Sequence, residues 1–352
     1  MDDNEFLVGT ICEQLSSGAP VVLASIIASK GSSPRHGGTK MVIAVSGKAF
    51  GTIGGGILEA TTIKESVTAL SSGHAEILSF NMAGESALSI DPICGGEATV
   101  LLDCVSPVAE NVNLFWRLHD AVVKGRDCYL LTVLEGRRDN VRVIGRSMLS
   151  PEGEVVGSYD WSDQHIEMVK FELHNISSTT VLALGDISVV VDPIRRTKTL
   201  YCFGAGHVAL PTAEAAALVG FRVVVVDDRA EFANAERFPL ANAVLVIDDF
   251  GRALEGLAID RDSFVIILTR GHFHDRVVLE QALKTNAGYI GMIGSRRKRD
   301  TIYATLSSQG VPPEQLDRVH CPIGLAIGAE TPEEIAISIV AELIAERARI
   351  RG

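Results

Sequence analysis

Hydrophobic and polar positions alternate with a regular rhythm in the second half of the chain, where each short apolar run is followed by a stretch of helical length. We interpret the apolar runs as strands: TLYCFGAG, FRVVVVDD, AVLVID, FVIILTR and YIGMIG. Helices are expected over 207–219, 230–236, 250–258, 275–286, 296–309 and 332–350. This alternation predicts an α/β fold with a doubly wound parallel sheet, as in a Rossmann-like domain.

The first half of the chain has no such regular alternation. Strand-like runs lie at 21–28, 41–45, 49–53, 77–81 and 98–105. Helical patterns lie at 4–17, from the three glycines at 54–56 to about residue 71, and at 111–125. The strand-like segments YLLTVLEG, RSMLSPEGEVVGSY and ISVVVDPI follow. We therefore expect a mixed α/β domain at 1–195, which would divide, if at all, into 1–110 and 111–195. A nucleotide-binding domain is expected at 196–352.

Charge and hydropathy disfavour several classes of protein. The 352 residues include 32 basic and 44 acidic ones, a net charge of −12. Nucleic acid is therefore not an expected partner, because neutralisation of phosphates dominates that binding. No apolar run is long enough for a membrane span, and the first ten residues are acidic where a signal peptide is basic. The six cysteines are scattered without a CxxC pair, as expected for reduced thiols in the cytoplasm.

The segment GAGHVA, residues 204–209, matches the G-x-G-x-x-G/A pattern of a dinucleotide-binding turn. Gly204 would allow the tight turn and Gly206 the close approach of a pyrophosphate, next to the N–H groups of the following helix. Asp227, at the end of the next strand, would hold a ribose hydroxyl, which favours NAD over NADP. The pattern leaves open a turn that binds nothing. His207 faces either solvent or the ligand.

Two other strand-to-helix loops are expected at the same edge of the sheet. His272, His274 and Asp275 have side chains suited to a metal ion. No HExxH or CxxC motif accompanies them, so a structural or proton-transfer role fits them equally well. Ser295 and Arg296 open a basic run at the start of a helix, where a phosphate would bind. The alternative for this run is a solvated helix face.

Three segments of the first half contain residues with binding chemistry. GSSPRHGG contains Arg35, GTIGGGILEA places Gly54, Gly55 and Gly56 before a helix, and ICGGE contains Cys94. From the pattern alone, tight turns explain the glycines. The thiol of Cys94 is either accessible, because two glycines follow it, or that of a small buried hydrophobic residue.

Long motifs of both halves occur in one order along the chain. They are GSSPRHGGTKM, GTIGGGILE, ICGGEATVLLD, FGAGHVA, VVVVDDR, YIGMIGSRRKR and CPIGLAIGAETPEEIAISIVAEL. Together these motifs resemble the xanthine dehydrogenase accessory protein family (XdhC/CoxI). The resemblance extends from residue 20 to 345, and residues 110–190 contribute little to it.

The resemblance implies a chaperone for the molybdenum cofactor, as molybdopterin or its cytosine dinucleotide form. Such a protein protects the cofactor while a cysteine desulfurase supplies sulfur, and inserts it into an apo xanthine dehydrogenase-type molybdenum hydroxylase. The resemblance also implies Cys94 as the thiolate near the molybdenum, and Arg35 with the Gly54–Gly56 loop as contacts to the pterin or its anion. A homodimer is expected from the family and from the apolar helix 333–345.

Two other functions stay open at the level of sequence. An NAD-dependent oxidoreductase would use the GAGHVA turn and Asp227, with His272 or His274 as acid–base, but it leaves the first half unexplained. A nucleotidyltransferase acting on the cofactor phosphate would use Asp227 with Asp228 and the basic loop at 295–299. We expect an accessory protein without turnover of its own. Its GAGHVA turn with the start of the following helix, which we call the cradle, would hold either the cofactor nucleotide or NAD.

Overall fold

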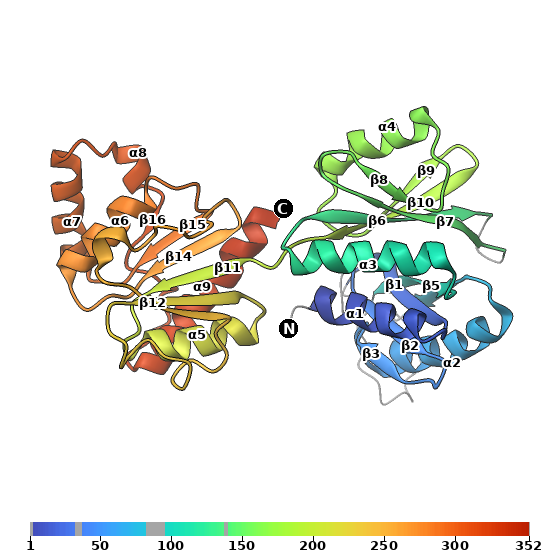
Figure 1. Ribbon diagram of the computed structural model, residues 1–352, viewed down its shortest axis with the longest axis horizontal. Coiled ribbons are helices and arrows are strands. Elements are labelled where there is room, and N and C mark those ends of the chain that lie inside the picture. The colour runs from blue at the N-terminus through green and yellow to red at the C-terminus, as the bar shows by residue number, and fades with distance from the viewer. Residues whose placement is uncertain (1–2, 32–36, 82–95, 137–139, 352) are drawn as a thin grey trace. The chain divides into compact units, whose positions relative to one another are not determined.

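The computed structural model describes residues 3–31, 37–81, 96–136 and 140–351. The chain divides into two compact units, Met1–Arg196 and Thr197–Gly352, which we call the N-terminal unit and the C-terminal unit. Figure 1 labels the elements of both units, and the colours from yellow-green to red mark the C-terminal one. Each unit has hydrophobic clusters of its own, so each is described by itself.

An antiparallel sheet of five strands forms the first part of the N-terminal unit. Its order is β3 (Ala49–Gly51), β2 (Lys40–Ala44), β1 (Val21–Lys30), β5 (Glu97–Val105) and β4 (Glu76–Asn81). Side chains alternate between the two faces of a strand. Val22 of β1 packs in one cluster with α2 (Gly56–Ser72), and Leu23 packs in another with α1 (Asp3–Ser16). The central strand β1 is therefore buried on both faces.

A second antiparallel sheet completes the N-terminal unit. Its order is β8 (Val155–Gly157), β7 (Arg142–Leu149), β6 (Cys128–Glu135), β10 (Ile187–Ile194) and β9 (Thr180–Leu184). The helix α3 (Ala109–Val123) lies beside α1 (Figure 1), and α4 (Asp163–Glu172), followed by a 3-10 turn at Leu173–Asn175, packs on the second sheet. Ile27 and Leu101 of the first sheet share a cluster with Leu134 and Val190 of the second. The two sheets therefore belong to one packed unit.

Buried ion pairs also join the two sheets. The guanidinium of Arg146 on β7 donates two hydrogen bonds to the carboxylate of Asp103 on β5, and both side chains are buried. The ammonium of Lys40 on β2 lies 2.9 Å from a carboxylate oxygen of Asp192 on β10. Removing one member of a buried pair leaves an unpaired charge and costs about 3–5 kcal/mol. These pairs therefore oppose any separation of the two sheets.

The C-terminal unit contains a parallel sheet of six strands. Their order is β13 (Ala243–Val246), β12 (Arg222–Asp227), β11 (Thr199–Phe203), β14 (Ser263–Ile267), β15 (Tyr289–Met292) and β16 (Val319–His320). The helices α5 (Ala209–Leu218) and α9 (Pro332–Arg351) cover one face, and α6 (His272–Ala282) and α7 (Arg296–Ser308) cover the other. Residues 313–316 form the short α8. Helices on both faces explain why strands such as VVVV are apolar throughout.

The parallel sheet confirms the predicted fold class of the second half. Strand order reverses direction between β11 and β14, since β11, β12 and β13 run one way along the sheet and β14, β15 and β16 the other. In open α/β sheets, ligands bind beside the carboxyl ends of the strands at such a switch point. The loop after β11 is therefore where a ligand is expected.

Three local predictions differ from the structure. Residues 230–236, predicted as a helix, form turns in which the side-chain amide of Asn234 donates to the carbonyls of Ala230 and Glu231. The helix predicted at 250–258 is reduced to a 3-10 turn at Phe250–Arg252. There the Asp249 carboxylate accepts the N–H of Gly251. Side-chain bonds to nearby backbone compete with helical ones, which explains both differences. The helix α4, which the sequence did not predict, begins at the N-cap Ser162.

Within the described residues, the structure contains no helix with the length and hydropathy that crossing a membrane requires.

Candidate functional site

The loop after β11 makes the tight turn that the GAGHVA pattern predicts. Gly204 has φ 109°, in the left-handed region, and its N–H donates to the Val226 carbonyl at 2.7 Å. A Cβ atom at Gly204 would lie 2.4 Å from the carbonyl oxygen of Leu268. Gly204 is thus wedged between the ends of β12 and β14, and only glycine fits there.

Gly206, two residues on, lies in open space. A Cβ atom at this position would meet no other atom within 4 Å. The following residues lead into α5. The first N–H groups of a helix have no partner inside the helix, and here that of Leu210 donates to the carbonyl of Gly206 at 3.3 Å. A helix start of this kind attracts anions. The space in front of Gly206 is therefore available to a phosphate group, and the exposed His207 lies beside it.

The carboxylate of Asp227 at the end of β12 is occupied by its own surroundings. It accepts the N–H of Ala205 at 2.7 Å and the guanidinium of Arg229 at 2.8 and 3.0 Å, and its side chain is buried. Burial alone would raise the pKa of Asp227, but the hydrogen bonds from Arg229 and Ala205 outweigh it and hold the pKa below its usual range. Asp227 thus fastens the turn and stays ionised, with its oxygens directed inward.

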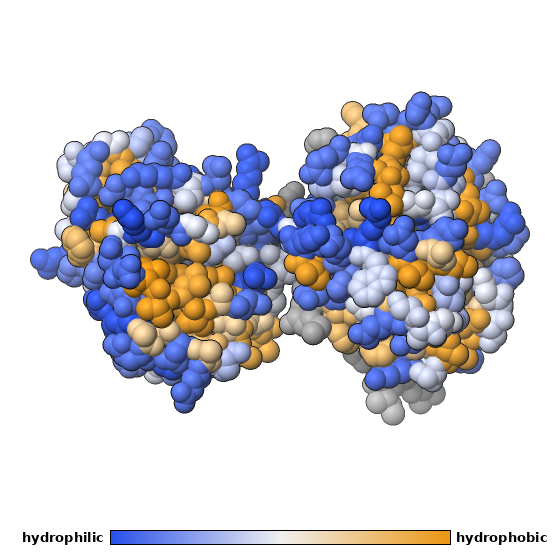
Figure 2. All heavy atoms as spheres, in the orientation of Figure 1, coloured by the Kyte–Doolittle hydropathy of each residue, from blue (hydrophilic) through white to orange (hydrophobic). Residues whose placement is uncertain are grey.

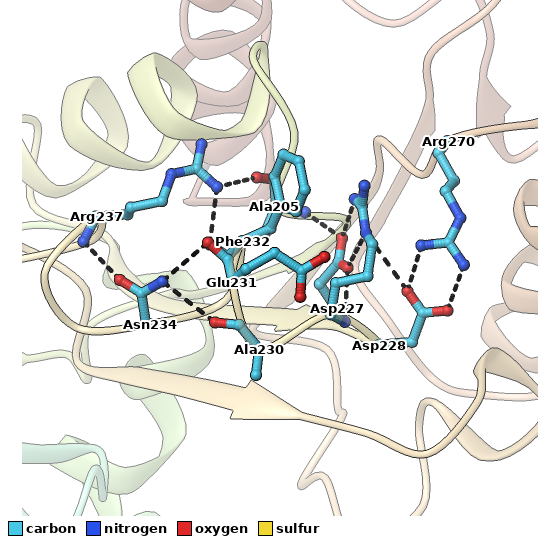
Figure 3. Close-up of polar contacts among 10 residues, drawn as sticks. Ala205, Asp227, Asp228, Ala230, Glu231, Phe232, Asn234, Arg237 and Arg270 are labelled. Carbon is cyan, nitrogen blue, oxygen red and sulfur yellow. Dashed lines mark hydrogen bonds and ion pairs between the residues drawn. The ribbon is translucent and has the colours of Figure 1, made fainter.

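A second arginine fastens the same turn from the other side. One nitrogen of Arg237 donates to the carbonyls of Ala205 at 3.0 Å and Phe232 at 2.9 Å. Figure 3 shows Arg237 and Asp227 on opposite sides of Ala205, with the 230–234 turns between them. Both the N–H and the carbonyl of Ala205 are therefore used inside the protein, and Ala205 offers a ligand neither.

An ion pair connects the loops that flank the turn. Arg270, in the loop after β14, donates to both carboxylate oxygens of Asp228, at 2.8 and 2.7 Å (Figure 3). The side chain of Arg270 is 42% exposed and that of Asp228 is 13% exposed. This pair is the most accessible of the charged contacts around the cradle described above.

In the N-terminal unit, the glycine-rich loop before α2 binds a carboxylate of its own. Gly54, Gly55 and Gly56 all have positive φ, and the carboxylate of Glu59 accepts the N–H of Gly55 at 3.2 Å and the hydroxyl of Thr52. The predicted anion site at this helix start is thus already filled by Glu59. The predicted ligands Arg35 and Cys94 lie outside the described residues.

Comparison with known families identifies both parts of the chain. Residues 14–81 match the model of the XdhC and CoxI family, and residues 200–343 match the model of the XdhC Rossmann domain. The two matches cover the glycine-rich loop before α2 and the whole cradle, in the order that the resemblance predicted. The chain belongs to the XdhC and CoxI family.

Curated members and a solved structure agree with this assignment. The chain is 27% identical to a probable xanthine dehydrogenase subunit of Bacillus subtilis, over 94% of both chains. It is 23% identical to the molybdenum cofactor insertion chaperone PaoD of Escherichia coli, over 98% of this chain and 89% of PaoD. A crystal structure of a xanthine dehydrogenase from Bacillus halodurans matches with a TM-score of 0.81 at 27% identity, over 99% of this chain and 96% of the other.

Another relative is much longer than this chain. The Escherichia coli protein YqeB, described as uncharacterized, is 28% identical over 325 residues. These residues are 92% of this chain but 43% of YqeB. The chain thus spans less than half the length of YqeB.

The other predicted loops of the XdhC Rossmann domain lie at the starts of α6 and α7. The ring of His274 packs 5.0 Å from that of Phe250, and His272 is exposed. No group of three or more His, Cys, Asp or Glu side chains that could hold a metal occurs among the described residues, so His272 and His274 have no third ligand there. Ser295 caps α7 by accepting the N–H of Lys298 at 3.2 Å, and Arg296 is exposed.

A buried carboxylate, which the sequence suggested only as a candidate metal ligand beside the two histidines, links these two loops. Asp275 on α6 is fully buried, pairs with Lys298 on α7 and accepts the hydroxyl of Thr269 at 2.6 Å. Burial raises the pKa of Asp275, and the bonds from Lys298 and Thr269 only partly offset this effect. The network fixes the starts of α6 and α7 relative to each other, and it occupies the ammonium of Lys298.

The cysteines that the structure describes are poor thiolates. Burial raises the pKa of Cys12 and Cys128 to about 12 and that of Cys104 and Cys321 to about 11, and it also raises the pKa of Cys202. Because the thiolate is the form that binds metals, none of these five side chains is suited to molybdenum at neutral pH.

Sequence reasoning found the turn but missed two of its arginines. The structure brings Gly204, Gly206 and Asp227 together at the switch point, as expected from the motif. Arg237 and Arg270 were not selected, because nothing in their local sequence marks them. The strand order usual for a Rossmann-like sheet could have indicated Arg270, since the loop after β14 lies beside the turn after β11.

Proposed function

We propose that this chain binds the molybdenum cofactor as cargo and helps to insert it into a molybdenum hydroxylase of the xanthine dehydrogenase type. The observation that carries the proposal is the alignment, along nearly the whole chain, with the molybdenum cofactor insertion chaperone PaoD. The relation to a probable xanthine dehydrogenase component supports the choice of client. In this role the chain is an accessory protein without turnover of its own.

The C-terminal unit suits the phosphate end of such a cargo. The molybdenum cofactor, as the family resemblance implies, ends in a phosphate or, in its cytosine dinucleotide form, in a pyrophosphate. The open space in front of Gly206 and the start of α5 provide N–H groups and a positive helix end for that anion. Ser295 and Arg296 would be further phosphate contacts at the start of α7.

Cys94 is our candidate for the molybdenum end. Sulfur ligands suit a metal that itself bears sulfur, and the five described thiols have pKa values too high for this role. In this proposal Arg35 and the Gly54–Gly56 loop contact the pterin. The loop does so through Gly56, because the N–H groups of Gly54 and Gly55 already donate to Thr52 and Glu59. A cysteine desulfurase would supply the sulfido ligand while Cys94 protects the metal, in the cytoplasm, where thiols stay reduced.

The cradle offers little to an NAD-dependent oxidoreductase. A ribose hydroxyl would require free oxygens at Asp227, and these are taken by Ala205 and Arg229. Asp228 is the acidic side chain left for such a contact, and it is paired with Arg270. NAD therefore ranks below the nucleotide of the cofactor as the expected ligand.

Exposed apolar side chains provide surface for protein partners, which a chaperone needs for its client and for a second copy. Figure 2 shows hydrophobic areas between hydrophilic ones on the face in view. On α9, Ala336, Ile339, Val340 and Leu343 are buried, whereas Ile337 is 57% exposed and Ile344 is 39% exposed. The proposed homodimer would cover these two isoleucines.

Retention of molybdenum tests the proposal. We expect the full chain, incubated with molybdenum cofactor and desalted, to retain molybdenum near one equivalent, measured by elemental analysis. Cys94→Ala should retain much less, and Cys104→Ala, which removes a half-buried thiol of high pKa, should retain as much as the wild type. Wild-type protein that retains no molybdenum but binds NAD tightly would show that the chaperone proposal is wrong.

A further inference from the structure

The pair Asp228–Arg270 lies across the carboxyl end of the central strand. Asp228 follows β12 and Arg270 follows β14, and β11 lies between these two strands in the sheet. Gly204, at the end of β11, donates to Val226 on one side and would touch Leu268 on the other with a Cβ atom. The ion pair therefore joins the two loops on either side of the GAGHVA turn. It lies at the switch point, where a ligand is expected.

Arg270 is the cation of this cluster that can turn to a ligand. Arg229 is held by Asp227 and stacks 3.9 Å above the ring of Phe232. Arg237 is held by two backbone carbonyls. Within the described part of the chain, Arg270 binds only the carboxylate of Asp228 through two nitrogens, and a guanidinium has five N–H donors in total. Donors of Arg270 therefore remain on an exposed side chain.

We infer that Arg270 binds a phosphate of the ligand in this crevice, and that Asp228 holds the guanidinium over the turn until that phosphate replaces it. The ligand group is a pyrophosphate or nucleoside diphosphate. Arginine forms paired hydrogen bonds with phosphate in the same planar geometry that it uses for a carboxylate. The inference rests on the proposed function only in taking the phosphate end of the cargo to enter the C-terminal unit.

The charges around the pair determine the sign of each effect. Asp228 adds a negative charge beside the expected phosphate, and it competes with the phosphate for Arg270. Its other cationic neighbour, Arg229 at 3.7 Å, stays with Asp227. Neutralising Asp228 removes both the repulsion and the competition, so it should strengthen binding of an anion. Removing Arg270 takes away a charged hydrogen-bond donor and should weaken binding.

Titration calorimetry of the full chain with inorganic pyrophosphate and with CDP tests the inference. Arg270→Ala should weaken binding of both probes about 10-fold or more, and Asp228→Asn should tighten it about 2- to 5-fold. In the double variant, Asp228→Asn should improve affinity less than it does in the wild type, because the competition for Arg270 is absent and only the relief of repulsion remains. Arg252→Ala, at an exposed pair with Glu255 on the same unit, is the matched control and should change neither affinity.

Circular dichroism melting of each variant separates binding effects from unfolding. Arg270→Lys, if folded, should bind both probes more tightly than Arg270→Ala and more weakly than the wild type. A folded Arg270→Ala that binds both probes like the wild type overturns the inference. So does an Asp228→Asn that weakens CDP but leaves pyrophosphate unchanged, because Asp228 would then be a ribose ligand. Molybdenum retention is measured separately. If the probe affinities change as predicted but the wild type retains no molybdenum, the chaperone proposal alone is refuted. If the wild type retains molybdenum but Arg270→Ala binds both probes normally, the role of Arg270 alone is refuted.

Discussion

Two glycines of one motif serve different physical purposes. Gly204 has a backbone conformation and a neighbour, the carbonyl of Leu268, that exclude any side chain. Gly206 has neither restriction, since its φ is not positive and no atom lies near its missing Cβ. The fold does not require glycine at Gly206, so the proposed close approach of a ligand is the reason we offer for it.

Substitution at these glycines should separate folding from binding. We expect Gly206→Val to keep the melting temperature of the wild type and to lose at least about 10-fold in pyrophosphate affinity, because the new side chain fills the space of the anion. Gly204→Ala should destabilise the C-terminal unit by about 1–3 kcal/mol from backbone strain alone. Urea unfolding and calorimetry measure the two effects. If Gly206→Val binds normally, the turn is architectural and holds no ligand.

The cradle could be predicted from sequence because its spacing and its context are local. The role of Asp227 could not, because a carboxylate at the end of β12 is compatible with both a ribose and an internal partner. The structure supplies that partner from two residues away, where Arg229 folds back onto it. Asp228, the neighbouring acid, is the one directed to another loop.

At the scale of elements, burial decided which predictions succeeded. The parallel strands, with Val, Ile and Leu on both faces, were found at their positions because helices cover both sides of the sheet. The polar turns at 230–236 were taken for a helix because their spacing resembles one, whereas Asn234 bonds locally to the backbone. The helix α4 was missed because its exposed face includes the apolar Met168 and Phe171, which obscure its amphipathic pattern.

The last strand and the last helix of the C-terminal unit are joined by an ionisable pair. His320 on β16 shares a hydrogen bond with Glu342 on α9, and Glu342 also accepts the N–H of Gly324. The bond with Glu342 raises the pKa of His320 above its ordinary 6.5. Burial acts to raise the pKa of Glu342, but the bonds from His320 and Gly324 outweigh it, so this pKa lies below 4.5.

This pair should make the stability of the unit depend on pH. The contribution of His320 is complete below about pH 6.5 and is lost as the pH rises through the raised pKa. The contribution of Glu342 is present above pH 4.5 and is lost as the pH falls through its lowered pKa. We therefore expect the free energy of unfolding, from urea titrations at pH 6 and pH 9, to fall more between these values in the wild type than in Glu342→Gln.

Glu280→Gln is the control for this comparison, because it removes an exposed carboxylate that pairs with Lys284 on α6. Its difference between pH 6 and pH 9 should match that of the wild type. Equal differences in all three proteins would contradict the stabilising role of His320 and Glu342.

At the scale of the whole molecule, the residues proposed to contact the cargo belong to two units. The GAGHVA turn, its two fastening residues Asp227 and Arg237, and the pair Asp228–Arg270 all belong to the C-terminal unit, which has hydrophobic clusters on both faces of its sheet. The candidate thiol Cys94 belongs to the N-terminal unit. No proposed contact to a phosphate comes from the N-terminal unit.

Residues 197–352, produced alone, should therefore fold and bind pyrophosphate. A unit with its own core unfolds cooperatively, so we expect a single melting transition. The affinity of the fragment for pyrophosphate should lie within about 3-fold of that of the full chain, because no phosphate contact proposed here comes from outside the unit. Gly206→Val in the same fragment controls for nonspecific binding, and molybdenum retention should be lost because Cys94 is missing. A fragment that folds but binds pyrophosphate more than about 10-fold more weakly would mean that the N-terminal unit completes the anion site.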